Sequence, residues 1–229
     1  MIMKFTIGKS EKVMRKGKFI TLEGGEGTGK STQAALLCEA MKRSGLNAIA
    51  VRSPGGTLIA EKLRSILKTK ESEDLTPETE LLLFGACHSQ MLKTLLEPEL
   101  EKGTIIISDR FFDSTTVYQG FARGLDPAMI ETINRFACRG LKPDLTIVLD
   151  IPPELGIARS LARGGAQTAA NDRFDSENMM FHTAVRNGFL KLAEKEPDRF
   201  RVISAEPPAD IVANSIKECV KHELGLEIL

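Results

Sequence analysis

Short runs of apolar and β-branched residues recur along the chain, separated by longer segments that mix apolar and polar positions. Runs of this length and composition are typical of β-strands. The predicted strands are Phe19–Glu23, Asn47–Val51, Thr104–Ser108, Leu145–Asp150 and Phe200–Ser204. The third and the fourth, TIIIS and LTIVLD, are almost wholly apolar. This composition indicates strands that are buried on both faces of a sheet.

The intervening segments carry apolar residues at the spacing of an α-helix. In Gln33–Arg43 these residues fall on one face, and Gly45 follows as a stop signal. Thr76-Pro77 favours the start of a helix that runs to about Glu99, because threonine caps a helix and proline fits its first turn. Further helices are predicted over Pro127–Arg139, Pro153–Arg163, Glu177–Glu194 and Ala209–Leu224.

The alternation of strands and helices predicts an α/β fold made of βαβ units. Such units form a parallel sheet with helices on both faces. Ligands of such a sheet bind beyond the carboxyl ends of its strands. Arg163–Asp172, with the sequence RGGAQTAAND, is rich in Gly and Ala and lacks apolar periodicity, so we expect a mobile loop there.

The composition narrows the class of protein. A chain of 229 residues suits one domain, or at most two. Lys plus Arg equals Asp plus Glu, at 31 each, which argues against a general nucleic-acid binder but leaves room for a small anion held by local arginines. No apolar run approaches the roughly 20 residues of a membrane-spanning helix. Four cysteines lack any metal-binding spacing and are predicted to be free thiols in a reducing cytoplasm: Cys38, Cys87, Cys138 and Cys219.

Residues 1–16 are polar and largely basic, without the apolar segment of a secretory leader. We therefore expect a flexible extension over 1–16 and a single folded domain over 17–229 that begins near Met14. Removal of residues 1–13 is expected to leave activity and Tm nearly unchanged.

The stretch LEGGEGTGKST follows the first predicted strand and opens the first helix. Its pattern Gly24-x-x-x-x-Gly29-Lys30-Ser31 in that context is typical of a phosphate-binding loop. Glycines permit backbone angles that turn successive N–H groups toward phosphate, and the helix dipole acts at the same point. The lysine can reach the β- and γ-phosphates, and the serine hydroxyl can bind Mg²⁺. The loop predicts a nucleoside triphosphate site and leaves transferase, hydrolase and switch open.

Other charged residues follow the remaining strands at the same edge. Asp109 and Arg110 come directly after the third strand, where the carboxylate can orient Mg²⁺ and the guanidinium can grip phosphate bidentately. Arg52 precedes a Pro-Gly-Gly turn after the second strand. Arginines this far from the lysine loop favour a second anion pocket, which a transferase between two nucleotides needs. Three more arginines follow the fourth strand: Arg159, Arg163 and Arg173. On a lid that closes over the site, they can neutralise the charge that develops on the transferring phosphoryl group.

Together, these motifs resemble the bacterial thymidylate kinase family in order and spacing, from about Lys18 to the C-terminus. The segments that carry the likeness are FITLEGGEGTGKST, RSPGGT, LLLFGACHSQ, SDRFFDSTTVYQG, LDIPPELGIARSLARG and NDRFDSE. The resemblance implies a P-loop kinase fold, with a five-stranded parallel β-sheet flanked by helices in three α/β/α layers, and a homodimer. It implies transfer of the γ-phosphoryl of ATP to dTMP, giving dTDP, with Mg²⁺.

The resemblance also assigns residues. Those implied to bind ATP are Gly24, Gly25, Glu26, Gly27, Thr28, Gly29, Lys30, Ser31 and Thr32. Those implied to bind dTMP are Glu26, Arg52, Phe84, His88, Arg110, Ser114, Thr115, Tyr118 and Gln119. Phe84 is implied to stack on thymine, and Glu26 to approach the 3′-hydroxyl. Ser31 and Asp109 are implied to hold Mg²⁺. The implied catalytic residues are Lys30, Asp109, Arg110 and Arg163, with Arg159 and Arg173 as alternatives on a mobile lid over about 159–176.

The chain departs from the family pattern at two residues of the motifs quoted above. Ser53 replaces a glutamate, and His88 stands where relatives carry an arginine near the thymine O4. A neutral histidine still donates one hydrogen bond, so a base contact at His88 is expected. The lid is also longer than expected, by Ala166–Asn171. The alternatives are a kinase of another pyrimidine monophosphate such as dUMP or CMP, a P-loop ATPase or switch without a small acceptor, and an inactive relative that only binds.

Overall fold

The structure is a computed structural model that describes residues 16–68, 74–170 and 173–229, and for 163–170 the backbone alone. The predicted N-terminal extension lies outside the described residues, apart from its last residue. Parallel strands form one five-stranded sheet in the order β2-β3-β1-β4-β5. Their bounds are β1 Phe19–Glu23, β2 Ala48–Arg52, β3 Ile105–Asp109, β4 Leu145–Asp150 and β5 Phe200–Ser204.

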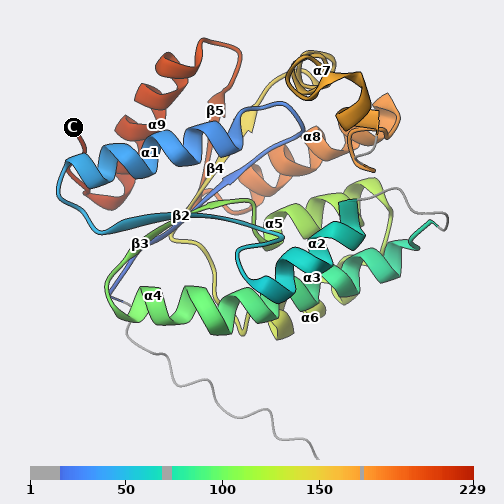
Figure 1. The fold of residues 1–229 in the computed structure, drawn as a ribbon, viewed down its shortest axis with the longest axis horizontal. Helices are drawn as coiled ribbons and strands as arrows, with labels where there is room; N and C mark the ends of the chain where they lie inside the picture. Colours follow the sequence, from blue (N-terminus) through green and yellow to red (C-terminus); the bar gives the residue numbers. More distant parts are fainter. Residues whose placement is uncertain (1–15, 69–73, 171–172) are drawn as a thin grey trace, which may run out of the picture.

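Helices cover both faces of the sheet (Figure 1). α1 and α9 lie together on one face, and α3, α4 and α8 lie on the other. Two segments, η1 and η2, are π-helical. The bounds are α1 Lys30–Arg43, α2 Leu58–Lys68, α3 Pro77–Met91, η1 Leu92–Leu96, α4 Glu97–Glu101, α5 Phe112–Thr115, η2 Thr116–Ala122, α6 Pro127–Ala137, α7 Pro153–Ala170, α8 Met179–Lys195 and α9 Ala209–Leu224.

Successive side chains of β1 pack into the core on opposite faces of the sheet, because side chains alternate across a strand. Ile20 packs with Leu37 of α1 and Ile216 of α9. Phe19 packs on the opposite face with Leu96. The residues of β1 are all buried, whereas the edge strands β2 and β5 each begin with a buried residue and then alternate between partly exposed and exposed positions. The three-layer arrangement follows from this two-sided burial, as predicted.

The strand register brings polar residues together at the carboxyl edge of the sheet. Asp109 is paired with Leu22 of β1 on one side and with Arg52 of β2 on the other. Glu23 ends β1 beside Val148 of β4. The carboxyl ends of β1, β2 and β3, which carry charged residues in the sequence, are therefore neighbours.

The predicted strands are confirmed, with β2 and β3 each displaced by one residue. The side chain of Thr76 caps α3 by accepting a hydrogen bond from the amide of Thr79 at 3.2 Å. The helix predicted from there to about Glu99 continues through η1 to the end of α4. Helices α2 and α5 and the π-helical η2 were not predicted.

One prediction is wrong within the described residues. Arg163–Asp172 was expected to form a loop, but the part up to Ala170 continues helix α7. Its arginine, glutamine and alanines are strong helix formers, and they outweigh the paired glycines. Whether the segment moves as a lid stays a prediction.

No helix within 16–68, 74–170 and 173–229 is long and apolar enough to cross a membrane. All four cysteines are free thiols, and only Cys219 is partly exposed.

Candidate active site

The glycine loop connects β1 to α1 and depends on unusual backbone angles. Gly24, Gly27 and Gly29 have φ values of 135°, 67° and 89°, a region that favours glycine. A Cβ at Gly27 would lie 1.8 Å from the carbonyl oxygen of Gly156 in α7, so a side chain cannot be accommodated there. Lys30, in the first turn of α1, donates to the carbonyl of Gly25 at 2.5 Å. The loop therefore curves around the ammonium group of Lys30.

Ser31 and Asp109 meet next to this loop. The Ser31 hydroxyl, in the first turn of α1, donates a hydrogen bond to Oδ2 of Asp109 at the end of β3. Both are hard oxygen donors, which Mg²⁺ prefers, and Mg²⁺ keeps several waters, so it needs few protein ligands. The pair fits the predicted Mg²⁺ site.

Arg110 links the glycine loop to the segment after β3. Its backbone is left-handed, with φ of 69°, which is uncommon for a residue with a side chain. Its guanidinium donates to the carbonyl of Gly24 at 2.8 Å, to Ser114 Oγ at 3.0 Å and to Glu26 Oε1 at 2.8 Å. Tyr118 donates its hydroxyl to the same oxygen of Glu26 at 2.7 Å. Arg110 is thus held in place by neighbours from both segments.

These charges shift one another's pKa values. Burial opposes ionisation of Glu26, but Arg110 and Lys30 outweigh it and lower the pKa of Glu26 to about 2. Burial and the nearby Arg110 lower the pKa of Lys30 to about 8. A bound polyphosphate would favour the charged form of Lys30, because opposite charges stabilise each other.

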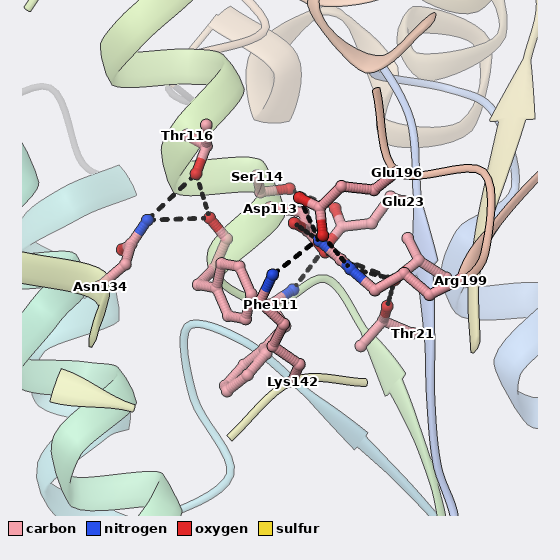
Figure 2. Close-up of polar contacts among 12 residues, drawn as sticks. Thr21, Glu23, Phe111, Asp113, Ser114, Thr116, Asn134, Lys142, Glu196 and Arg199 are labelled. Carbon is pink, nitrogen blue, oxygen red and sulfur yellow. Dashed lines mark hydrogen bonds and ion pairs between the residues drawn. The ribbon is translucent and has the colours of Figure 1, made fainter. Parts of the chain in front are cut away.

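A buried polar network supports Phe111, Asp113 and Ser114, which follow Arg110 in the sequence (Figure 2). Glu23, at the end of β1, accepts hydrogen bonds from the Phe111 amide at 2.7 Å and from the Ser114 hydroxyl at 2.6 Å. Asp113 accepts two bonds from Arg199, at 2.7 and 2.8 Å. Burial and the neighbouring Asp113 raise the pKa of Glu23 to about 8. The network fixes the segment 110–114 to the sheet.

One cavity of about 170 Å³ joins the glycine loop to the other predicted residues. Its lining includes all the residues implied to bind the acceptor, together with Asp109 and part of the loop. These lining residues are Glu26, Gly27, Gly29, Lys30, Ser31, Arg52, Phe84, His88, Asp109, Arg110, Ser114, Thr115, Tyr118 and Gln119. Gly24, Gly25 and Thr28 line a second, smaller cavity, and Thr32 lines neither. The loop and the two predicted phosphate-binding arginines therefore face a common space.

Several buried polar atoms along this cavity have no hydrogen-bond partner within the described parts of the chain. They are Ser53 Oγ, His88 Nδ1, Thr115 Oγ1 and Gln119 Oε1. Buried polar groups are almost always hydrogen-bonded, so such a cluster is typical of a site for a polar ligand. Burial lowers the pKa of His88 to about 4, so its imidazole is neutral at physiological pH.

The predicted arginines outside the loop differ in their surroundings. Arg52 lies at the cavity, is 55% exposed and pairs with Glu61 at 2.8 Å. Arg159 donates to the carbonyls of Ala205 and Glu206 at 2.6 and 2.8 Å. Arg173 donates to Glu80 at 2.6 Å. Arg163 lies on α7, and its side chain is outside the description.

Sequence reasoning missed other residues of the cavity. Arg64 and Lys68 line it from α2, and Phe174 lines it from the segment before α8. The apolar spacing of LIAEKLRSILK after the Gly-Gly turn is a signal that could have revealed α2 and its basic residues. Glu23 was seen only as the last residue of a strand, and nothing in the local pattern marks its long-range partners.

Comparisons with known proteins show the family of the chain. The profile of the family described as thymidylate kinase matches residues 22–216. A thymidylate kinase from Desulfosudis oleivorans is 47% identical over 198 residues, which cover 85% of this chain and 92% of the relative. One from Trichlorobacter lovleyi is 41% identical over 211 residues, which cover 92% of this chain and 100% of the relative.

The fold agrees as well. The crystal structure of a thymidylate kinase from Ehrlichia chaffeensis aligns with a TM-score of 0.70 and 31% identity, over 89% of this chain and 98% of that one. With its phosphate loop, its five-stranded parallel sheet and relatives that match over most of their length, this chain belongs to the thymidylate kinase family.

Proposed function

We propose that the chain transfers the γ-phosphoryl group of ATP to dTMP, giving dTDP and ADP. Family membership supports this reaction, and the observation that carries it is the shared cavity. Lys30 of the glycine loop and Arg110 of the second predicted anion pocket line the same space. A phosphotransferase needs its donor and acceptor phosphates to meet end to end, whereas a hydrolase needs one phosphate pocket.

The donor side consists of the glycine loop and α1. Backbone N–H groups of the loop and the N-terminus of α1 would hold the β- and γ-phosphates, with Lys30 as the cation beside them. Ser31 and Asp109 would hold Mg²⁺, which when bound neutralises charge on the β- and γ-phosphate oxygens. Catalysis then consists mostly of positioning and charge neutralisation.

The acceptor side consists of arginines and a polar pocket. Arg110 and Arg52 would hold the phosphate of dTMP in line with the γ-phosphorus. Its ionised oxygen attacks, the bond from phosphorus to the bridging oxygen breaks, and ADP leaves. No proton has to be removed from a phosphate oxygen that is already ionised, so a strong general base is unnecessary. Glu26 would accept a hydrogen bond from the 3′-hydroxyl.

The base would occupy the part of the cavity lined by Phe84, His88 and Gln119. Phe84 offers an aromatic face on which a pyrimidine ring can stack. We propose that Arg163 supplies additional positive charge during transfer. Arg159 donates to two backbone carbonyl groups and Arg173 donates to Glu80, so either of these alternatives would have to leave its partners to reach the transferring group.

Release of ADP measured across a panel of acceptors tests the proposal. Reactions would contain ATP, Mg²⁺ and one of dTMP, dUMP, CMP or dCMP, with a parallel reaction that lacks any monophosphate. We expect the highest kcat/KM with dTMP. ADP release at an equal rate without an acceptor would instead support an ATPase or switch. A preference for CMP would support a kinase of another pyrimidine monophosphate.

We further propose that two copies associate through the outer face of α2, α3 and α6. These helices are neighbours, since α2 and α6 both pack against α3. Exposed apolar side chains gather on them: Leu58, Ile59, Ile66, Leu82, Met129 and Phe136. Exposed apolar patches typically mark interfaces.

The free thiols favour the cytoplasm as the location of the protein.

A further inference from the structure

Glu80, at the start of α3, is the centre of a buried polar cluster. Its side chain is 1% exposed. Arg123 donates to its two oxygens at 3.1 and 3.2 Å, and Arg173 donates to Oε1 at 2.6 Å. Guanidinium groups can only donate, so both oxygens of Glu80 act as acceptors. Glu177 also pairs with Arg123, at 2.7 Å, and balances the second positive charge.

This cluster determines which way the amide of Gln119 points. Gln119 is fully buried and donates its Nε2 to Glu80 Oε2 at 3.0 Å. An amide offers donors at its nitrogen and an acceptor at its oxygen, and only the nitrogen can face Glu80 favourably. The oxygen of Gln119 therefore points away from Glu80. It is buried, has no partner among the described residues and belongs to a side chain that lines the cavity.

A buried bare carbonyl oxygen is costly unless the ligand brings a donor to it. Thymine and uracil carry a hydrogen on ring N3 between two carbonyl groups, whereas the N3 of cytosine is an acceptor at neutral pH. The N3 of cytosine would face the oxygen of Gln119, so two hydrogen-bond acceptors would oppose each other. The neutral imidazole of His88 can donate or accept according to its tautomer, so it cannot make this distinction alone.

We propose that Glu80 is a positioning residue that sets the nucleobase preference: by holding the Gln119 carbonyl toward the cavity, it selects pyrimidines that carry a hydrogen on N3. This inference rests on the proposed function, because it assumes that a pyrimidine nucleotide occupies the cavity. It assigns discrimination against cytosine to a carboxylate that need not touch the substrate.

The test compares the kcat/KM ratio of dTMP to dCMP in the wild type and in Glu80→Gln. The substituted amide can offer a donor to the Gln119 oxygen, so the Gln119 amide is free to turn. We expect the dTMP to dCMP ratio to fall about tenfold or more, as hydrogen-bond discrimination by a buried site is of at least this size. The dTMP to dUMP ratio and the KM for ATP should stay unchanged, because both pyrimidines carry the N3 hydrogen.

Two further variants separate positioning from a structural role. Gln119→Leu removes the acceptor oxygen and leaves the arginine contacts of Glu80, so it should lower the dTMP to dCMP ratio as Glu80→Gln does. Glu177→Gln weakens the same cluster without touching Gln119, so its ratio should equal that of the wild type. Thermal unfolding of each variant shows whether it is folded, and calorimetric binding of dTMP and dCMP gives the ratio without turnover.

A folded Glu80→Gln enzyme with the wild-type dTMP to dCMP ratio would overturn the inference. If that variant does not fold, an unchanged ratio in Gln119→Leu would overturn it equally. A wild-type enzyme that phosphorylates dTMP and dCMP equally well would contradict the inference but would still support the proposed kinase activity. A wild-type enzyme that does not phosphorylate dTMP refutes the proposed function itself.

Discussion

At the scale of single residues, the candidate site depends on a few side chains that each contact several partners. Glu26 Oε1 accepts hydrogen bonds from both Arg110 and Tyr118. The guanidinium of Arg110 also lies over the Tyr118 ring, 5.0 Å from its centroid. Such a shared arrangement keeps a guanidinium in one orientation before any phosphate arrives, which reduces the entropy lost on binding.

Arg110→Lys is expected to raise the KM for dTMP at least about tenfold, because an ammonium group cannot replace the planar fork that contacts Gly24, Ser114 and Glu26. Steady-state kinetics with dTMP varied at saturating ATP would measure the change. Arg52→Lys is the matched comparison. We expect a smaller effect there, since Arg52 is more exposed. Equal effects of the two variants would contradict the central position given to Arg110.

His88→Ala is expected to raise the KM for dTMP with little effect on the KM for ATP. The imidazole is buried, lines the cavity and leaves Nδ1 without a partner among the described residues. Its loss removes both a polar contact and part of the cavity wall. Ser89→Ala, at the exposed next position, serves as the control. An unchanged KM for dTMP would show that His88 does not contact the base.

Glu23 gives the folded state a defined pH dependence. Its pKa is raised in the folded protein from the usual 4.5 to about 8, so the folded state holds an additional proton between these values. Its contribution to stability is therefore complete below about pH 4.5 and is lost as the pH rises through about 8. Melting temperatures of wild type and Glu23→Gln from pH 5 to 9 would measure this, because the variant lacks the titrating group.

The advantage of Glu23→Gln over the wild type should grow as the pH rises. The amide keeps an acceptor for Phe111 and stays neutral. A difference between the two melting temperatures that does not depend on pH would show that Glu23 is ionised throughout this range.

At the scale of elements, the close packing of α8 against η2 supports the residues that face the cavity. A Cβ on Gly188 of α8 would lie 2.9 Å from Val117 Cγ1 and 3.0 Å from Phe121 Cγ. Val117 is fully buried and has little room to move. η2 also carries Tyr118 and Gln119, so its position is coupled to the cavity.

Gly188→Ala is therefore expected to lower the free energy of unfolding by about 1–3 kcal/mol, the usual cost of overpacking. The KM for dTMP should rise with it, because η2 must shift. Urea unfolding and steady-state kinetics would measure the two effects. Glu194→Ala, an exposed change on the same helix, should alter neither. A Gly188→Ala protein as stable as the wild type would show that the helices can separate at no cost.

The elements also show how far sequence reasoning reaches. The strands and the glycine loop were predicted because their signals are local: a run of apolar residues, or glycines beside a lysine. The supporting contacts are not local, since Glu23 and Phe111 are 88 residues apart and Glu80 and Gln119 are 39 apart. The extension of α7 was missed because two glycines were given more weight than the helix formers around them.

At the scale of the whole molecule, α3 connects the outer surface to the cavity. Leu82 is 61% exposed on the outer side, whereas Phe84 and His88 on the same helix are buried and line the cavity. An interface formed by α2, α3 and α6 would therefore hold the helix that carries the base-binding residues (Figure 1). Association of two copies and affinity for dTMP are then expected to change together.

The combined change Leu82→Glu and Phe136→Glu tests this coupling, because two charges on each copy would face the same apolar surface of its partner. Size-exclusion chromatography with light scattering should give the mass of two chains for the wild type and of one chain for the variant. The KM for dTMP should rise in the variant while that for ATP changes little, since none of the exposed apolar residues on this face belongs to the glycine loop. Met180→Glu, a similarly exposed position on α8, should remain a dimer with wild-type kinetics. A wild-type chain that is monomeric at micromolar concentration would refute the interface, and a monomeric variant with an unchanged KM for dTMP would separate assembly from base binding.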